Sequence, residues 1–233
     1  MSKSMWVGVS EYGGVPTPTR RGNPLPPSWR LEAIWATERP RTPSISTDGR
    51  RVAFIQDRDT SDVWLLDLET GHASRLTTGR QPMPYWEDTT PLFSPDGTRV
   101  AYADEGAVRV VATDGGPPRR IVEAGAPVWL DDATLVVTIE RDDCGRLAVV
   151  DVADPWPQRL GRDHGGLDDR GDEGGAVVSP DGRHVAYAFH SRADLGRQEI
   201  RVVDVSTGAV RALTGSPGIL DHQPVWSPDG TLL

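Results

Sequence analysis

The stretch SPDGTRVAYA, residues 94–103, decides the fold. Its first four residues, Ser94 to Gly97, form a tight-turn sequence, because an Asp side chain can bond the backbone two residues on and a Gly accepts a positive φ. The run that follows is apolar and contains a β-branched and an aromatic residue, which is typical of a short strand. The stretch therefore predicts a turn that leads directly into a β-strand.

The same signature recurs along the chain. It appears as STDGRRVAFI (46–55) and SPDGRHVAYA (179–188), and its beginning appears in PVWSPDGTLL (224–233). A variant, PVWLDDATLVVT (127–138), keeps Trp129 where the last copy has Trp226. Recurrence at intervals of this length signals stacked structural units. We therefore expect five units, which start near Pro43, Pro91, Pro127, Ala176 and Pro224.

Each complete unit contains four short extended segments separated by turn sequences. Near-continuous apolar runs such as VWLLDL (63–68) and IRVVDV (200–205) fit strands that are covered on both faces. The pattern predicts an all-β β-propeller of four-stranded antiparallel blades. A β-sandwich is the alternative, but it does not require one ten-residue signature in every unit. The expected blades are 43–90, 91–126, 127–175 and 176–223, about four complete blades, and the start of a fifth is expected at 224–233, so that the arc is open and incomplete.

Residues 1–42 lie outside the repeats and are expected to form an N-terminal arm. The segment GVPTPTRRGNPLPP (14–27) is Pro-rich and is predicted to be extended or disordered. Residues 28–38 could form a short helix that starts at Ser28 and places Leu31, Ile34 and Trp35 on one face.

Composition narrows the classes of function. The chain has 25 Lys and Arg residues against 34 Asp and Glu residues, a net charge of −9 that repels phosphate backbones and argues against a nucleic-acid partner. The lone Cys144 excludes an internal disulfide. No apolar run reaches the length of a signal peptide at the N-terminus, or of a membrane span later in the chain. We therefore expect a cytoplasmic protein with no membrane partner.

Motifs that carry chemistry do not occur in the sequence. It contains no Gly-x-Ser-x-Gly nucleophile elbow, no HExxH and no paired CxxC. We therefore assign no catalytic residue, no metal ligand and no cofactor to residues 1–233. The repeated Asp residues resemble an array of carboxylates, but their role in the turns accounts for them.

Topology gives a better indication of where binding occurs. Successive turns of a four-stranded antiparallel blade alternate between two faces. The long irregular segments, such as the Gly-rich loop GRDHGGLDDRGDEGG (161–175), should gather on the face of the second-to-third hairpins and of the blade-to-blade connections. Irregular loops on a rigid scaffold are where binding usually resides. The acidic cluster at 168–173 could hold a cation or a ligand amine, or it could be solvated charge. The candidate binding residues on this face are Trp86, Glu87, Asp88, His164, Asp172, Glu173, Asp221 and His222.

The repeat resembles that of two known groups of propellers. PLFSPDGTRVAY (91–102) and PVWSPDGTLL (224–233) resemble the WD-repeat-like blades of the TolB-like propellers of the Tol–Pal system. They also resemble the N-terminal propeller of prolyl-oligopeptidase-family serine peptidases of the dipeptidyl aminopeptidase and acylaminoacyl-peptidase types. Residues 39–79 look like the first blade of the cytoplasmic acylaminoacyl-peptidase-like enzymes. Tol-type propellers are periplasmic and need a signal peptide, so the resemblance favours the peptidases.

The resemblance implies a function for the domain. Such peptidases place an α/β-hydrolase domain after the propeller, which filters short peptides by size and presents them to the catalytic residues. No hydrolase motif lies within 1–233, so the chain is expected to be a propeller truncated before its catalytic domain. Asp172-Glu173 is the acidic pair nearest to the paired Glu with which the dipeptidyl enzymes hold a substrate amine.

Two other readings stay open. The first is a non-enzymatic TolB-like propeller that binds a protein or a glycan. The second is a propeller enzyme such as a polysaccharide lyase, with its site in a later blade. The sequence leaves the oligomeric state open.

Overall fold

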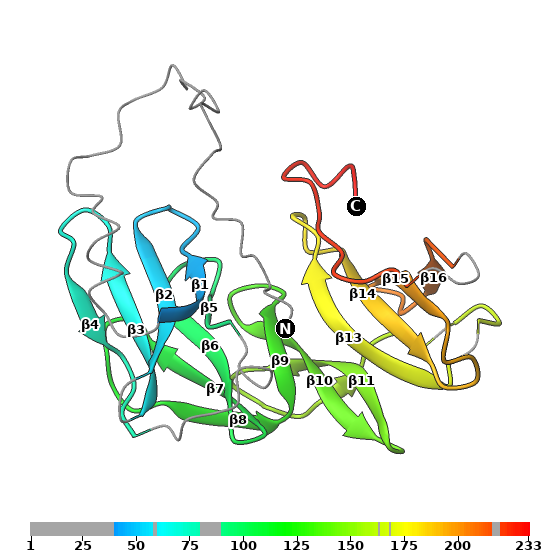
Figure 1. Ribbon diagram of the computed structural model, residues 1–233, viewed down its shortest axis with the longest axis horizontal. Coiled ribbons are helices and arrows are strands. Elements are labelled where there is room, and N and C mark those ends of the chain that lie inside the picture. The colour runs from blue at the N-terminus through cyan, green and yellow to red at the C-terminus, as the bar shows by residue number, and fades with distance from the viewer. Residues whose placement is uncertain (1–39, 58–59, 80–89, 163, 168, 216–219) are drawn as a thin grey trace, which may run out of the picture.

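The computed structural model describes residues 40–57, 60–79, 90–162, 164–167, 169–215 and 220–233. These residues form four four-stranded antiparallel sheets, each with its strands in sequential order, arranged as the successive blades of an open arc (Figure 1). The prediction of an all-β propeller with antiparallel four-stranded blades is confirmed. The helix predicted at 28–38 lies outside the described residues.

The strands have the following bounds. Blade 1 comprises β1 (Pro40–Ile45), β2 (Arg51–Asp57), β3 (Ser61–Asp67) and β4 (Ala73–Arg75). Blade 2 comprises β5 (Leu92–Phe93), β6 (Arg99–Asp104), β7 (Ala107–Ala112) and β8 (Arg119–Glu123). Blade 3 comprises β9 (Gly125–Trp129), β10 (Thr134–Arg141), β11 (Cys144–Asp151) and β12 (Gln158–Arg159). Blade 4 comprises β13 (Gly171–Val178), β14 (His184–Ser191), β15 (Gln198–Asp204) and β16 (Val210–Ala212).

Two strands begin earlier than the sequence indicates. β1 starts at Pro40, inside the segment predicted as an arm through residue 42. β13 starts at Gly171, although 161–175 is predicted to be one loop. That prediction is wrong at its C-terminal end, because Gly171 to Gly174 pair in register with β14 despite a sequence that contains no β-branched residue.

The SPDG sequences form the turns between the first and second strands. In blade 2, Ser94 Oγ donates a 2.6 Å hydrogen bond to Asp96 Oδ1, which also accepts the backbone N–H of Thr98 at 2.9 Å. Gly97 adopts a φ of 69°, in the left-handed region that favours glycine. The Ser94 hydroxyl and the Thr98 N–H lower the pKa of Asp96 because they stabilise its charged form. The structural role predicted for these Asp residues is confirmed.

A related turn yields a test by pH. Asp204 Oδ1 accepts hydrogen bonds from the Ser206 hydroxyl and from the N–H and hydroxyl of Thr207, and these lower its pKa to about 2 from an ordinary value of 3.8. The stabilisation is complete above the unfolded value and is lost as the pH falls through the folded one. We expect Asp204→Asn to reduce the loss of stability between about pH 4 and about pH 2. Urea unfolding across this range measures it.

The control for this test is Asp114→Asn, at an exposed position in the β7–β8 turn. It should leave the dependence of the unfolding midpoint on pH as in the wild type. Equal acid sensitivity of the wild type and Asp204→Asn would contradict the assignment.

The turns separate onto two faces, as predicted. The turn face carries the SPDG turns and the third-to-fourth turns, which are joined by backbone hydrogen bonds such as Leu68 N to Arg50 O and Val205 N to Arg183 O, 2.8 and 2.9 Å. The loop face carries the second-to-third hairpins and the blade-to-blade connections. There Ala124 N donates to Gly106 O at 3.1 Å.

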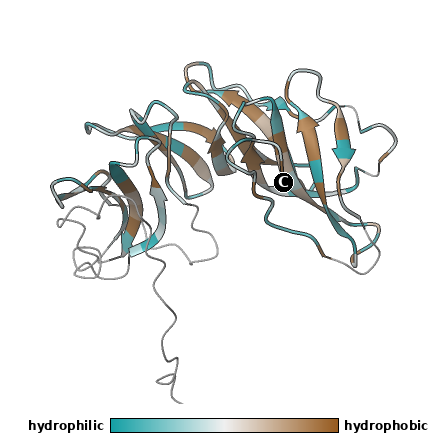
Figure 2. Cartoon of the chain, turned by 90° about the horizontal axis from the view of Figure 1, so that it is seen from above, coloured by the Kyte–Doolittle hydropathy of each residue, from teal (hydrophilic) through white to brown (hydrophobic). Residues whose placement is uncertain are grey.

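The core lies between adjacent blades, where buried apolar residues of neighbouring sheets form three clusters. Figure 2 shows apolar residues, in brown, along the strands of the blades. In β15, for example, Ile200, Val202 and Val203 are all buried. A strand buried on both sides reads as a continuous apolar run, which explains the sequence pattern. Each blade therefore depends on its neighbour for the burial of its apolar surface.

A recurring contact, here called the aromatic junction, joins blade 1 to blade 2 and blade 2 to blade 3. The Arg51 guanidinium of blade 1 lies 5.6 Å from the centre of the Phe93 ring of blade 2, and Arg99 of blade 2 lies 5.3 Å from the centre of the Trp129 ring of blade 3. A cation over an aromatic face is attracted by the ring quadrupole. The Trp129 indole N–H also donates to Leu92 O at 2.9 Å.

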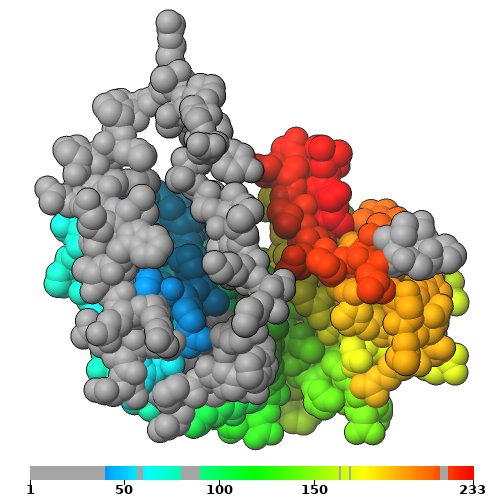
Figure 3. Space-filling model, viewed as in Figure 1, coloured from blue at the N-terminus to red at the C-terminus, as the bar shows by residue number. Residues whose placement is uncertain are grey.

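The C-terminal segment repeats this contact on blade 4. The Trp226 indole N–H donates to Val177 O at 3.2 Å, and the Trp226 ring lies 6.4 Å from that of His184, which occupies the position of Arg99. Figure 3 shows the segment, in red, lying against blade 4. Residues 224–233 therefore dock as the first strand of blade 3 does on blade 2.

Candidate functional site

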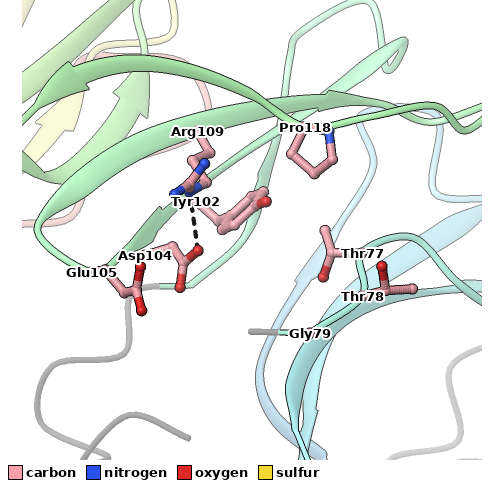
Figure 4. Close-up of a pocket in the computed structure, with 8 residues that line it drawn as sticks. All are labelled: Thr77, Thr78, Gly79, Tyr102, Asp104, Glu105, Arg109 and Pro118. Atoms are coloured by element: carbon pink, nitrogen blue, oxygen red, sulfur yellow. Dashed lines mark ion pairs between the residues drawn. The ribbon is translucent and has the colours of Figure 1, made fainter. Parts of the chain in front are cut away.

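A cavity of about 260 Å³ opens on the loop face between blades 1 and 2 (Figure 4). Residues 77–79, which leave β4, form one wall. The other wall comes from blade 2 and consists of Tyr102, Asp104, Glu105, Arg109 and Pro118. Inter-blade clefts on the loop side of a rigid scaffold are suited to binding. We call this space the blade 1–2 cavity.

An ion pair occupies the blade 2 wall. Arg109 Nε lies 3.0 Å from Asp104 Oδ2, and the two side chains are 27% and 9% exposed. The tight β6–β7 hairpin places them together: Glu105 and Gly106 both have positive φ, 50° and 71°, as in the hairpin turns that match strand twist. Tyr102 lies directly opposite Arg109 in the register of the two strands.

The blade 1 wall is held by its own hydrogen bonds. Thr77 Oγ1 accepts the backbone N–H of Val63 at 3.0 Å and donates to Asp62 Oδ1 at 3.0 Å. Asp62 also pairs with Arg75 of β4. Since these groups are satisfied within the blade, Thr77 shapes the cavity, and the neighbouring Thr78 is exposed at its edge.

Blade 4 contains the same Tyr–Arg pair in a closed setting. Tyr187 lies opposite Arg201, as Tyr102 lies opposite Arg109. Arg201 is 0% exposed, its Nε donates to Glu199 Oε1 at 2.7 Å, and its guanidinium lies 3.5 Å from the centre of the Phe189 ring. Burial raises the pKa of Tyr187, and the Glu173 carboxylate raises it further. The counterpart of the blade 1–2 cavity is thus filled by side chains.

Glu173 lies in this filled region instead of a solvated loop. It is 3% exposed and forms a two-pronged ion pair with Arg159, with both N–O distances 2.6 Å. Its Oε2 also accepts the backbone N–H of Leu147 at 2.9 Å, so that the carboxylate links β11, β12 and β13. Such a charge-assisted fork is among the stronger hydrogen-bonding arrangements in proteins.

His164 lies close to the same ion pair. Its side chain is partly buried, and its Nδ1 has no hydrogen-bond partner within the described part of the chain. Burial lowers the pKa of His164, and the nearby Glu173 carboxylate partly opposes that effect. His164 and Glu173, two members of the predicted set, are therefore near enough for the Glu173 charge to act on the imidazole.

Asp172 points to the other face of β13, because side chains alternate along a strand. Its Oδ1 accepts the backbone N–H of Gly145 at 2.9 Å, and Arg192 contacts both carboxylate oxygens at 3.2 Å. Burial would raise the pKa of Asp172, but the bonds from Arg192 and Gly145 outweigh it and lower the pKa. Asp172 and Glu173 are therefore engaged separately by arginines and do not form one acidic pair.

The remaining candidates lie further apart. Asp221 is half-buried and its N–H donates to Gln198 O at 3.2 Å, while His222 is exposed beside it. Trp86, Glu87 and Asp88 lie outside the described residues. The candidates that the structure describes are thus on the loop face of blades 3 and 4, but they do not converge on one cavity.

One feature of the sequence indicates the blade 1–2 cavity, although the predicted candidate residues do not include it. An arginine interrupts the apolar third segments AVRVVA (107–112) and EIRVVD (199–204). A charged residue in the middle of a strand covered on both faces must be paired. Arg109 and Arg201 were not included among the candidate residues because the segments around them are otherwise apolar.

Within the described residues, no three His, Cys, Asp or Glu side chains are grouped closely enough to hold a metal ion. That part of the chain also has no helix of the length and apolar character needed to cross a membrane.

Sequence comparisons link the chain to two kinds of curated protein. No family model matches it. The uncharacterized peptidase YuxL of Bacillus subtilis is 24% identical over 82% of this chain and 28% of its own length. The TolB homologue of Chlorobium chlorochromatii is 30% identical over 61% of this chain and 32% of its own length. The chain thus spans about a third or less of these relatives.

Solved structures share the fold. TolB from Acinetobacter baumannii superimposes with a TM-score of 0.62 at 20% identity, covering 83% of this chain and 47% of that one. Dipeptidyl peptidase 4 from Porphyromonas gingivalis gives 0.54 at 12% identity, covering 77% and 33%. The protein therefore has a TolB-like β-propeller fold. Its sequence is distantly related both to the Bacillus subtilis peptidase and to the Chlorobium TolB homologue.

Proposed function

We propose that the chain is the substrate-gating propeller of a prolyl-oligopeptidase-family serine peptidase that cleaves short peptides in the cytoplasm. One observation carries the proposal: the similarity to the Bacillus subtilis peptidase extends over 82% of this chain but only 28% of that enzyme. Most of that peptidase lies outside the alignment. Residues 1–233 contain no nucleophile elbow, so catalysis belongs to an α/β-hydrolase domain outside them.

The architecture supports this role. The blades form a rigid scaffold, and their irregular segments gather on the loop face. If further blades closed this arc, the central channel of the propeller could admit a short extended peptide and exclude a folded protein on steric grounds. The cavity on the same face offers polar groups to a bound chain end.

Serine-reactive labelling tests the proposal. The coding sequence beyond residue 233 would be read, and the full-length protein purified beside residues 1–233 alone. We expect a downstream Gly-x-Ser-x-Gly motif, covalent labelling of full-length protein by a fluorophosphonate, and cleavage of short peptides in preference to folded proteins. Residues 1–233 alone should remain unlabelled and inactive. A reading frame that ends without the motif would overturn the proposal.

A TolB-like protein- or glycan-binding module is the second candidate. The 30% identity to the Chlorobium homologue and the TM-score of 0.62 to the Acinetobacter protein favour it. It predicts that the full-length protein resists the fluorophosphonate. It also predicts that an added blade or blades, and no hydrolase, follow residue 233.

A further inference from the structure

Five Asp-Gly pairs occur in the chain, and the structure holds one of them differently from the others. An Asp-Gly pair is chemically reactive, because a glycine leaves its own nitrogen open to attack the carboxyl carbon of the aspartate before it. Asp114-Gly115 lies in the β7–β8 turn. The other four belong to the Ser-x-Asp-Gly turns, and they are Asp48-Gly49, Asp96-Gly97, Asp181-Gly182 and Asp229-Gly230.

The four Ser-x-Asp-Gly turns fix both groups that would have to react. In each turn the serine hydroxyl donates to Oδ1 of the aspartate at 2.6 Å. The same oxygen accepts the N–H of the residue after the glycine, at 2.9 to 3.1 Å. The glycine N–H, which carries the attacking nitrogen, donates to the serine carbonyl at 2.8 to 2.9 Å. The carboxyl group and the nitrogen are therefore held by separate hydrogen bonds.

The same hydrogen bonds keep these four carboxylates ionised. Ring closure expels the carboxyl hydroxyl as water, so it proceeds from the neutral acid. Ser227 and Thr231 lower the pKa of Asp229 to about 2 from an ordinary value of 3.8. At neutral pH this change reduces the amount of neutral acid roughly fiftyfold. The serine hydroxyl and the following N–H also lower the pKa of Asp48, Asp96 and Asp181.

Asp114 lies in a turn that lacks these restraints. Its side chain is exposed and forms no hydrogen bond or ion pair with the part of the chain that the structure describes. Gly115 and Gly116 are exposed too, and open space surrounds both. The Gly115 N–H makes a longer hydrogen bond of 3.2 Å, and residues 115–118 belong to no strand, since β8 begins at Arg119. The backbone can therefore rotate to bring the Gly115 nitrogen to the carboxyl carbon.

We propose that Asp114 is a site of spontaneous isomerisation to isoaspartate. The Gly115 nitrogen forms a bond to Cγ of Asp114, its proton and the carboxyl hydroxyl leave as water, and a five-membered succinimide results. Water then opens one of the two ring carbonyls, which returns either aspartate or isoaspartate. Isoaspartate adds a methylene to the main chain beside Thr113, whose hydroxyl accepts a 3.1 Å hydrogen bond from Arg51 of blade 1. The modification therefore lies next to the contact between blades 1 and 2.

Ageing the full-length protein at neutral pH in water enriched with heavy oxygen tests the proposal, because hydrolysis of the succinimide leaves one heavy oxygen in the product. Mass spectrometry of the digested protein reads each Asp-Gly pair separately. We expect label at Asp114-Gly115 to accumulate at least about tenfold faster than at Asp229-Gly230, given the scarcity of neutral acid at Asp229. Ageing in urea should bring the five pairs to similar rates, because unfolding removes the turns. Equal rates in the folded protein, or a contrast that persists in urea, would overturn the proposal.

Three variants connect the reaction with the turn. Asp114→Glu requires a six-membered ring and should remove the label at this position. Asp114→Asn should react faster than the wild type, because the amide is neutral at every pH and expels ammonia. Ser179→Ala removes the hydroxyl that holds Asp181 and should raise the rate there about fivefold, the factor that one hydrogen bond contributes. An Asp114→Asn variant that stays unlabelled would show that this turn cannot close the ring, and would exclude the site.

Discussion

Glu173→Ala should lower the free energy of unfolding by about 3–5 kcal/mol, the range for breaking a buried ion pair from one side. The Glu173 side chain is 1% exposed and that of Arg159 is 19% exposed, so the arginine would keep its charge with little access to water. The backbone N–H of Leu147 would lose its acceptor as well. Both penalties arise at the contact between blades 3 and 4.

Urea unfolding followed by circular dichroism measures this loss, and the neighbouring residue supplies the control. Asp172 pairs with Arg192 at the surface, with side chains 40% and 47% exposed, and Asp172→Ala should cost about 1 kcal/mol or less. Adding Arg159→Met to Glu173→Ala should restore part of the stability, because the unpaired charge is gone. Equal losses for Glu173→Ala and Asp172→Ala would contradict the buried ion pair.

Trp129→Ala should cost about 3–5 kcal/mol, as expected for removal of a large buried aromatic side chain. Trp129 is 6% exposed, packs in the core between blades 2 and 3, and lies under Arg99. Its truncation removes apolar contacts, a hydrogen bond to Leu92 and a cation–π contact in one step. The melting temperature and the urea midpoint should both fall.

Two controls divide this effect. Trp129→Phe keeps an aromatic ring at the junction but removes the indole N–H that donates to Leu92 O. The loss of this hydrogen bond should lower the free energy of unfolding by about 1 kcal/mol. Trp156, 76% exposed, is the matched tryptophan on the surface, and Trp156→Ala should stay within about 0.5 kcal/mol of the wild type. Similar losses at positions 129 and 156 would refute the junction.

The repeat and its turns could be predicted because their chemistry is local. Ser94, Asp96 and Gly97 form their hydrogen bonds within a few residues, so the Ser-x-Asp-Gly sequence gives the same turn in blades 1, 2 and 4. The assignment of the two faces followed from strand alternation alone. The fold class and the four complete blades of this chain could therefore be predicted from the sequence.

The candidate site was harder to predict from the sequence, because its contacts join residues that are far apart along the chain. Glu173 was placed in a Gly-rich loop, yet Arg159 and Leu147, 14 and 26 residues away, hold it as part of a strand. The cavity depends on how the exit of blade 1 faces the β6–β7 hairpin, and no local pattern encodes that arrangement. An arginine inside an apolar run was the one readable sign.

The aromatic junctions give the arc a direction. At each one the earlier blade contributes the residue that opens its second strand, Arg51, Arg99 or His184, and the later blade contributes the ring. A folded blade thus presents a surface on which the first strand of the following blade can pack as that strand leaves the ribosome. Since each unit contacts mainly its neighbours, assembly can advance from the N-terminus one blade at a time.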